Sequence, residues 1–166
     1  MPIVPIADVP AAQVEALLDR AFGSGRRART AYRIRAGTTP IASLSFVALD
    51  DDGGVIGSIQ SWPVEFAGDD GSRVPLVMVG PIAVEPQVQR GGLGRILTRH
   101  MLEAADAHGR TALMLIGDPE YYDRFFGFTP AKTAGWRLPG PFEPRRLLAR
   151  GDDVPSGTGD IGPRAE

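Results

Sequence analysis

The chain of 166 residues has no cysteine and only two histidines, His100 and His108. The missing thiols exclude disulfides, thiolate zinc sites and a cysteine nucleophile, and two imidazoles are too few for most histidine-rich metal sites. No apolar run approaches the roughly 18 residues of a membrane span. The formal net charge of -2 gives no general attraction to nucleic acids or anionic membranes. We therefore expect no metal, nucleic acid or membrane as a partner.

The composition that remains is that of a folded domain. Hydrophobic residues make up 43% and charged residues 23% of the chain, which suits one domain with a sizeable core. The N-terminus lacks a basic start followed by a long apolar run, so we expect no signal peptide and a cytoplasmic, bacterial-type protein. We place the domain at residues 1–150. The segment 151–166 is rich in Gly, Pro and Asp and is predicted to be a disordered tail.

Alternating and periodic apolar patterns predict the order of the elements. The predicted strands cover residues 4–6, 43–49, 55–64, 75–84, 111–116, 128–138 and 145–149, and the predicted helices cover residues 11–22, 92–107 and 120–126. The turn Asp50–Gly54 between two strands is a hairpin signal. The fold class is therefore α/β (α+β), with a single mixed, mostly antiparallel sheet of six to seven strands flanked by helices.

A glycine-rich turn separates the strand at 75–84 from the helix at 92–107. It runs from Gln89 to Arg95 and has glycines at positions 91, 92 and 94. Such a turn presents backbone N–H groups at a helix N-terminus, where anions such as phosphates bind. A nucleotide P-loop would need Lys and Ser/Thr after its glycines, but Arg95 and Ile96 follow. A dinucleotide fingerprint would need Gly or Ala where Leu97 stands.

The turn is similar to the Gln/Arg-x-x-Gly-x-Gly/Ala pyrophosphate loop of the GNAT superfamily, the acyl-CoA-dependent N-acyltransferases. A second segment, Gly117–Phe128, resembles the closing part of that family, in which a short helix with a Tyr precedes Gly-Phe. Within the family, the chain resembles the small bacterial acetyltransferases related to YhbS. The similarity covers residues 11–149 and is most specific between Val79 and Phe128. It implies the acyl-CoA N-acyltransferase fold.

The resemblance implies that acetyl-CoA, as a co-substrate, binds between the strand ending at Val84 and the strand ending at Ile116. The pantetheine amides would pair with the first of these strands, and the pyrophosphate would rest on N–H groups of the turn. A backbone N–H near Val84 would polarise the thioester carbonyl. The cofactor-binding residues expected from the resemblance are Ile82, Ala83, Val84, Gln89, Arg90, Gly91, Gly92, Leu93, Gly94 and Arg95.

Tyr122 is the residue that the resemblance assigns to protonating the departing CoA thiolate. The family commonly has a Tyr four residues before the Gly of Gly-Phe, but that position here is Asp123. Tyr122 lies five residues before Gly127, and Tyr121 remains an alternative.

A protonated amine must lose a proton before it attacks, so a carboxylate or a chain of waters would help. Asp118 is the first candidate for this base, with Glu120, Glu65 and Glu85 as alternatives.

The predicted activity is acetyl transfer from acetyl-CoA to a primary amine, by direct attack in a ternary complex. The missing cysteine fits a reaction without a thiol intermediate. The alternative is a non-catalytic acyl-CoA-binding sensor or regulatory module, because the Tyr is shifted from the family position. The acceptor is not identified: a small amine, an amino acid, an aminoglycoside and a protein amine all remain open. The resemblance is also compatible with a homodimer. The basic run from Arg26 to Arg35 is either a solvated face or a contact to an anionic ligand or partner.

Overall fold

The computed structural model describes residues 2–166, except for the side chains of Gln89 and Arg90. The elements, with η for 3₁₀ helices, are β1 (Ile3–Pro5), η1 (Ile6–Asp8), α1 (Ala11–Phe22), η2 (Ser24–Ala28), α2 (Thr30–Ile34), η3 (Ala42–Leu44), β2 (Phe46–Leu49), β3 (Val55–Gly68), β4 (Arg73–Val84), η4 (Pro86–Gly91), α3 (Leu93–Ala107), β5 (Leu113–Ile116), α4 (Pro119–Phe126), β6 (Trp136–Arg137), η5 (Pro144–Arg146), β7 (Leu147–Arg150) and β8 (Gly159–Pro163). Among the described residues, no helix combines the length and apolar character needed to cross a membrane.

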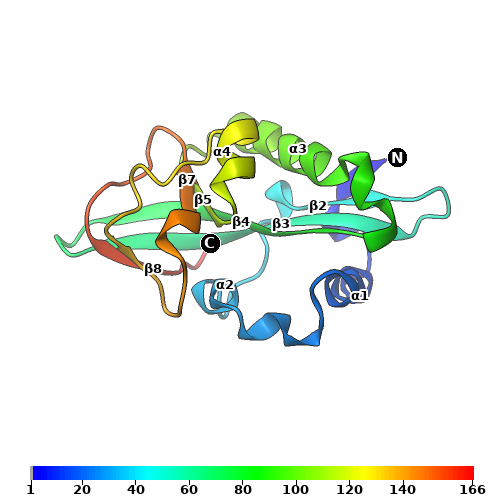
Figure 1. Ribbon diagram of the computed structural model, residues 1–166, viewed down its shortest axis with the longest axis horizontal. Coiled ribbons are helices and arrows are strands. Elements are labelled where there is room, and N and C mark those ends of the chain that lie inside the picture. The colour runs from blue at the N-terminus through cyan, green and yellow to red at the C-terminus, as the bar shows by residue number, and fades with distance from the viewer. Residues whose placement is uncertain (1) are drawn as a thin grey trace. The chain divides into compact units, whose positions relative to one another are not determined.

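The strands form one eight-stranded sheet (Figure 1). Its main path runs β1-β2-β3-β4-β5-β7, and β8 pairs with both β3 and β6. The pairs β4–β5 and β6–β8 are parallel, whereas β1–β2, β2–β3, β3–β8 and β5–β7 are antiparallel. The predicted mixed, mostly antiparallel sheet with flanking helices is therefore confirmed.

The chain divides into two compact units, which are described in turn. The first contains the chain up to Arg27 together with residues 40–61 and 80–108. It holds β1, β2, α1, η4 and α3, with the beginning of β3 and the end of β4. This unit carries the glycine-rich turn.

Helix α1 covers one face of the strands in the first unit. Its apolar residues follow the i, i+3, i+4 spacing of a single helical stripe. The buried cluster between helix and strands consists of Val14, Leu17, Leu18, Val47, Val55 and Ala83. The helix ends at Gly23, whose φ of 85° is in the left-handed half of backbone space and whose N–H donates to the Asp19 carbonyl at 2.9 Å. The bounds predicted for this helix are confirmed.

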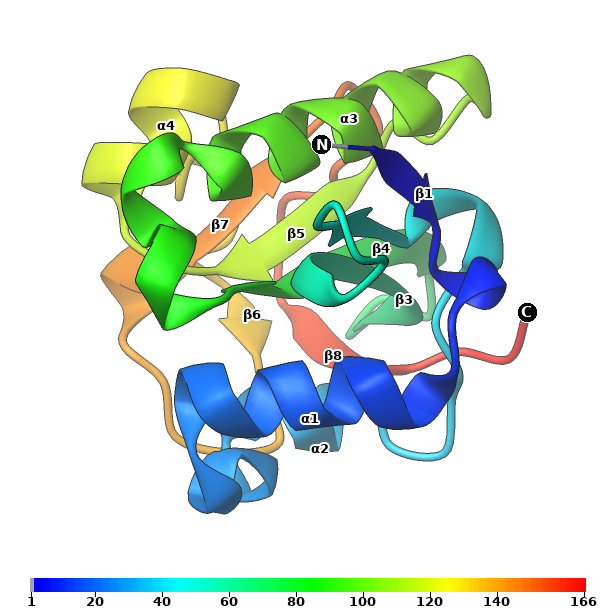
Figure 2. The same ribbon diagram turned by 90° about the vertical axis from the view of Figure 1, so that its right-hand side faces the viewer.

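Helix α3 covers the opposite face of the same strands (Figure 2). The contact is close at Gly57 of β3, where a Cβ atom would lie 2.9 Å from the Leu93 side chain and 3.0 Å from that of Leu97. A Cβ here would force the ends of these leucine side chains to shift, and glycine spares the helix that rearrangement. The first turn of α3 is thereby fixed against the sheet.

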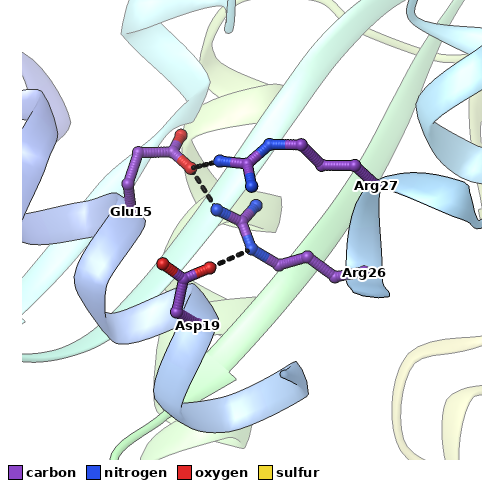
Figure 3. A network of polar contacts seen from close by, with 4 residues as sticks. All are labelled: Glu15, Asp19, Arg26 and Arg27. Atoms are coloured by element: carbon purple, nitrogen blue, oxygen red, sulfur yellow. Dashed lines mark hydrogen bonds and ion pairs between the residues drawn. The ribbon is translucent and has the colours of Figure 1, made fainter. Parts of the chain in front are cut away.

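The basic run begins with Arg26, whose polar contacts are drawn in Figure 3. Arg26 is 2% exposed, and its Nε donates to Asp19 Oδ1 at 2.9 Å while a terminal nitrogen donates to the Glu15 carboxylate. Arg27 donates to the same Glu15 oxygen at 3.1 Å. These charge-assisted bonds tie η2 back to α1. Arg26 is therefore neither part of a solvated face nor a contact to an anionic ligand or partner, because its charge is already neutralised inside this unit.

The second unit contains residues 28–39, 62–79 and 109–166. Its core lies on the remaining part of the sheet together with α2. The buried members are Ile34, Trp62, Val64, Phe66, Leu76, Met78, Ala112, Met114, Trp136, Leu147, Ala149, Val154 and Ile161.

Arg35, at the other end of the basic run, is also buried. Its guanidinium carbon lies 3.9 Å from the ring centroids of both Tyr32 and Trp62. Such stacking is a cation–π arrangement that stabilises a desolvated guanidinium. The run is therefore not an uninterrupted basic surface.

The strand predicted at 128–138 is wrong for most of its length. Thr129 forms only an isolated bridge with Ala149. Pro130 follows and has no N–H to donate to a strand ladder. The Thr133 hydroxyl then donates to the Leu147 carbonyl at 2.7 Å, and strand pairing resumes only at β6.

Strand β8 lies within the segment 151–166, for which the sequence predicts disorder. It pairs with β3 from Val64↔Pro163 to Gly68↔Gly159. A Cβ on Gly159 would lie 2.6 Å from the Ala67 carbonyl oxygen. The glycines that suggest disorder therefore permit a close strand approach.

Candidate functional site

The end of β4 is oriented by one backbone hydrogen bond. The Glu85 N–H donates to the Ile56 carbonyl of β3 at 2.8 Å. Successive N–H groups of a strand point to alternate edges. The N–H groups of Ile82 and Val84 therefore face the edge of β4 that lies away from β3.

The side chains at this end of β4 alternate between two faces. Ala83 is 1% exposed and belongs to the cluster beneath α1. Ile82 and Val84 point to the other face, where their Cγ2 atoms lie 4.0 and 3.8 Å from the position of a Cβ on Gly94. They form an apolar floor beside the start of α3.

The chain enters α3 through Gly92, which is the N-cap and has left-handed backbone angles, φ 72° and ψ 19°. A residue with a Cβ would cost about 1–2 kcal/mol in this conformation. The first helical bond runs from the Ile96 N–H to the Gly92 carbonyl at 3.1 Å. The earlier N–H groups of Leu93 and Gly94 have no acceptor within the helix. Since the Leu93 side chain is buried, that residue can offer a ligand only its N–H.

Gly91 and Gly94 differ from Gly92, since neither has a positive φ. No described heavy atom lies within 4 Å of a Cβ on Gly91, and the nearest to a Cβ on Gly94 is Val84 Cγ2 at 3.8 Å. Packing within the described residues leaves room for a Cβ at both positions. Glycine there keeps the N–H groups of the helix start uncovered, as a ligand that must approach the backbone requires.

The charge near this helix start suits an anion. The first turn of α3 has no acidic residue, and it contains Arg95, which is exposed. The helix dipole adds partial positive charge at the same end. The side chains of Gln89 and Arg90, which the sequence also predicts to bind the cofactor, lie outside the described residues.

In the second unit, α4 carries the predicted proton donor. This helix follows its N-cap Asp118, with Pro119 at the first position, and ends at Gly127, whose φ is 71°. The Tyr122 ring lies against Gly117, where a Cβ would be 2.5 Å from the ring atom Cε2. Gly117, directly after β5, therefore makes the space that the ring occupies.

The Tyr122 hydroxyl keeps its proton at neutral pH. Burial, aided by Tyr121 and Asp118 and opposed by Arg146, raises the pKa of Tyr122 to about 12. Within the described part of the chain, no hydrogen bond engages this hydroxyl. The group is a neutral phenol with its proton available for donation.

Tyr121, the alternative donor, belongs to an aromatic cluster on α4. Its ring centroid lies 5.3 Å from that of Phe125 and 6.0 Å from that of Phe126. The Tyr122 ring packs edge-on to Tyr121, at 4.9 Å, and to Phe128, at 6.5 Å. The two tyrosines therefore have different surroundings although they are adjacent.

All the candidate carboxylate bases are ion-paired with arginines. The pairs are Asp118–Arg146 at 3.0 Å, Glu120–Arg145, Glu65–Arg73 at 2.6 Å and Glu85–Arg20 at 2.8 Å. The side chains of Asp118 and Glu120 are 65% and 66% exposed, against 20% for Glu65 and 17% for Glu85. The first two are therefore in better contact with water. No group of three or more metal-ligating side chains occurs among the described residues.

The predicted residues thus lie in two groups. Ile82, Val84 and the start of α3 share one surface of the first unit, whereas the Ala83 side chain lies on the opposite face beneath α1. Tyr122 and Asp118 lie together on α4 and its N-cap in the second unit. Sequence reasoning missed the roles of Gly57 and Gly117. Their only signal is a glycine within or directly after an apolar strand, which a bulge or a turn explains equally well.

Comparison with known proteins identifies a family, a sequence relative and similar solved structures. The sequence pattern of the Acetyltransferase (GNAT) domain matches residues 5–131. The chain is 33% identical, over 117 residues, to the uncharacterized N-acetyltransferase YhbS of Escherichia coli K12, a match that covers 70% of this chain and 67% of that protein.

Two solved structures agree with the family match and with the similarity to YhbS. The crystal structure of E. coli YhbS in complex with CoA has a TM-score of 0.74 and 28% identity, and the match covers 96% of this chain and 88% of that chain. A GNAT family acetyltransferase from Brucella melitensis, solved with acetyl-CoA, has a TM-score of 0.65 and 24% identity and covers 99% of this chain and 96% of that one. The second likeness shows the shared fold.

The raised pKa predicts a distinct tyrosine in an alkaline titration followed by tyrosinate absorbance. Tyr122 should ionise near pH 12, and this step should vanish in Tyr122→Phe. Because the folded-state pKa exceeds the unfolded value of 10.0, the stabilising contribution is complete below pH 10 and is lost as the pH rises through 12. Titration of every tyrosine together near pH 10 would contradict the burial of this hydroxyl.

Proposed function

The chain belongs to the GNAT acetyltransferase family, and we propose that it transfers the acetyl group of acetyl-CoA to a primary amine by direct attack. The observation that carries the proposal is the glycine-lined start of α3 beside the outward N–H edge of β4. The CoA complex of the similar YhbS supports the choice of donor. We propose further that both units act as one transferase domain.

Backbone groups hold the donor. The pyrophosphate oxygens accept hydrogen bonds from the N–H groups of Leu93 and Gly94, and the helix dipole adds about 0.3–1 kcal/mol per charge. The pantetheine amides pair with β4 at Ile82, as an added strand would. The Val84 N–H polarises the thioester carbonyl. Arg95 supplies charge attraction to the phosphates.

The acceptor must arrive as a free amine. An amine with a lysine-like pKa of about 10.4 is almost wholly protonated at neutral pH, a penalty of roughly 4.6 kcal/mol at pH 7. Once deprotonated, the nitrogen attacks the carbonyl carbon, the C–N bond forms, the C–S bond breaks, and CoA leaves as a thiolate. The nitrogen loses one proton and the sulfur gains one, so the products are an amide and CoA thiol.

Tyr122 acts as the general acid toward the departing sulfur. A phenol with a pKa of about 12 is a weaker acid than a thiol, which has a pKa near 8.5. Transfer is therefore completed only if the phenol regains a proton in the same step. The proton lost by the attacking nitrogen supplies it, so that Tyr122 relays a proton from nitrogen to sulfur.

Asp118 serves as the base through water. Its exposed carboxylate can exchange protons with solvent although Arg146 holds one of its oxygens. Glu120 is the first alternative, since it is equally exposed. Glu65 and Glu85 are the less exposed alternatives.

The second candidate function is a non-catalytic acyl-CoA-binding module. Asp123 at the common family position of the Tyr is the observation that favours it. The acceptor class, a homodimer and a cytoplasmic location remain predictions from the sequence.

Filling the space at Gly94 should separate donor binding from folding. In Gly94→Leu, the side chain would cover the N–H groups of the helix start, and the affinity for CoA should fall by about a hundredfold, or 2.7 kcal/mol. The melting temperature should not fall, because leucine favours a helix over glycine by roughly 0.5–1 kcal/mol. Gly94→Ala is the control and should lose less than about tenfold. Calorimetric titration with CoA and thermal unfolding provide both readouts, and wild-type affinity in Gly94→Leu would exclude CoA from this helix start.

Activity tests the reaction itself, by release of free CoA from acetyl-CoA with a panel of primary amines. Tyr122→Phe should lower kcat by about 10²–10⁴, the usual contribution of a general acid, and should leave the KM for acetyl-CoA unchanged. Tyr121→Phe is the matched control and should stay within about threefold of wild type, since only Tyr122 is assigned to proton transfer.

Equal losses in the two tyrosine variants would refute the assignment of Tyr122. Tight CoA binding without turnover of any amine by the wild type would favour the non-catalytic module instead.

A further inference from the structure

Two buried oxygen atoms on β3 have no hydrogen-bond partner among the residues that the structure describes. They are Ser58 Oγ and Gln60 Oε1. Ser58 is 0% exposed and Gln60 is 5% exposed. Most buried polar groups in proteins are hydrogen-bonded, so each exception needs an explanation.

Neighbouring serines of the same unit show that this region can satisfy buried hydroxyls. Ser61 Oγ donates to the Leu44 carbonyl at 2.7 Å, and Ser45 Oγ donates to the Ile41 carbonyl at 2.8 Å. Both serines are 0% exposed, as Ser58 is. Among the described side chains, the missing partner is thus a feature of Ser58 Oγ and Gln60 Oε1 and not of the whole region.

The two side chains share the face of the sheet that α1 covers. Ser58 pairs with Val47 of β2, and Val47 belongs to the cluster beneath α1. Residues two apart on a strand point to the same face, at a spacing of about 7 Å. Gln60 therefore lies on the same face as Ser58.

The pair also lies next to the proposed thioester site. Because Glu85 bonds to Ile56 across β3 and β4, the antiparallel register of this hairpin puts Ser58 opposite Ala83. The outward N–H of Val84 belongs to the next peptide. A molecule that binds on the α1 face near this end of β4 would therefore meet Ser58 Oγ and Gln60 Oε1, the unsatisfied polar atoms among the described side chains.

The chemistry of the pair selects a donor. A glutamine carbonyl oxygen only accepts hydrogen bonds, whereas a serine hydroxyl both accepts and donates. A ligand that satisfies both oxygens must bring hydrogen-bond donors, and the N–H groups of a primary amine or an ammonium group supply them. Burying the two oxygens without a hydrogen bond costs the free energy of removing them from water. A bound donor would offset this cost.

We propose that Ser58 and Gln60 recognise the acceptor, by accepting hydrogen bonds from its N–H groups on the α1 face of β3. The inference rests on the proposed function, because it identifies the acceptor side of the same reaction. Both oxygens are covered in the structure, so the acceptor reaches them only when the side chains above β3 move aside.

The test uses Ser58→Ala and Gln60→Met, which remove the oxygens and keep similar shapes. The probes are ethanolamine, glycinamide, Nα-acetyl-lysinamide, spermidine and kanamycin, with N,N-dimethylethanolamine as a probe that lacks a primary amine. Each variant should raise the KM for the best amine by about tenfold and leave the KM for acetyl-CoA within about twofold. Melting temperatures should stay equal or rise, since an unsatisfied buried group has been removed.

Ser61→Ala is the matched control on the same strand. Its hydroxyl already donates to the Leu44 carbonyl, so the melting temperature should fall by about 2–8 °C. The KM for amines should stay the same. A shift in melting temperature caused by each amine in the presence of CoA gives a second readout, independent of turnover.

The outcomes separate this inference from the proposed function. Turnover with unchanged KM for amines in both variants overturns the inference and leaves the function standing. Absence of turnover, with amine-induced thermal shifts that disappear in the two variants, supports the inference although the function fails. If neither turnover nor amine-induced shifts occur, the inference and the proposed function are overturned together. If Ser58→Ala and Gln60→Met lower the melting temperature and leave the KM for amines unchanged, the oxygens bind internal water and the inference is overturned.

Discussion

The chain must pass from the end of β4 into α3 without placing a side chain over the first N–H groups of that helix. Gly92 makes the turn with left-handed backbone angles, and Gly91 and Gly94 leave the approach open. Glu85 fixes the point of departure, because its N–H bonds to Ile56 and its carboxylate pairs with Arg20. The direction of the β4 N–H groups, and with it the proposed position of the thioester, follows from this arrangement.

The parts of the fold that local sequence determines are predictable. Helices α1 and α3 each bury one apolar stripe, so their periodicity alone locates them closely. The hairpin of β2 and β3 is marked by its turn, in which Asp50 Oδ1 accepts hydrogen bonds from the N–H groups of Asp52 and Gly54. Strand β8 and the interruption after Thr129 could not be predicted, because both depend on partners far away in the sequence.

The same division holds for the candidate site. The glycine-rich turn is readable because its chemistry lies in the backbone of consecutive residues. The burial that raises the pKa of Tyr122 depends on its surroundings in the fold, including Gly117 and Arg146, and the unsatisfied oxygens of Ser58 and Gln60 emerge only once β2, β3 and α1 are packed. Arg26 is a further case, since its position in the sequence suggests a solvated charge whereas the fold buries it between two carboxylates. Donor binding is therefore encoded locally, while the proposed proton transfer and acceptor recognition depend on tertiary packing.

Backbone amide resonances report on pyrophosphate binding at the start of α3. They can be followed in a nuclear magnetic resonance titration of the labelled protein with CoA and, separately, with pantetheine, which lacks the pyrophosphate. If the start of α3 binds the pyrophosphate, CoA shifts the amides of Leu93 and Gly94 and pantetheine leaves them in place, while both ligands shift Ile82 and Val84. Saturating CoA that leaves the Leu93 and Gly94 amides unmoved would contradict the assignment of this helix start as the donor site.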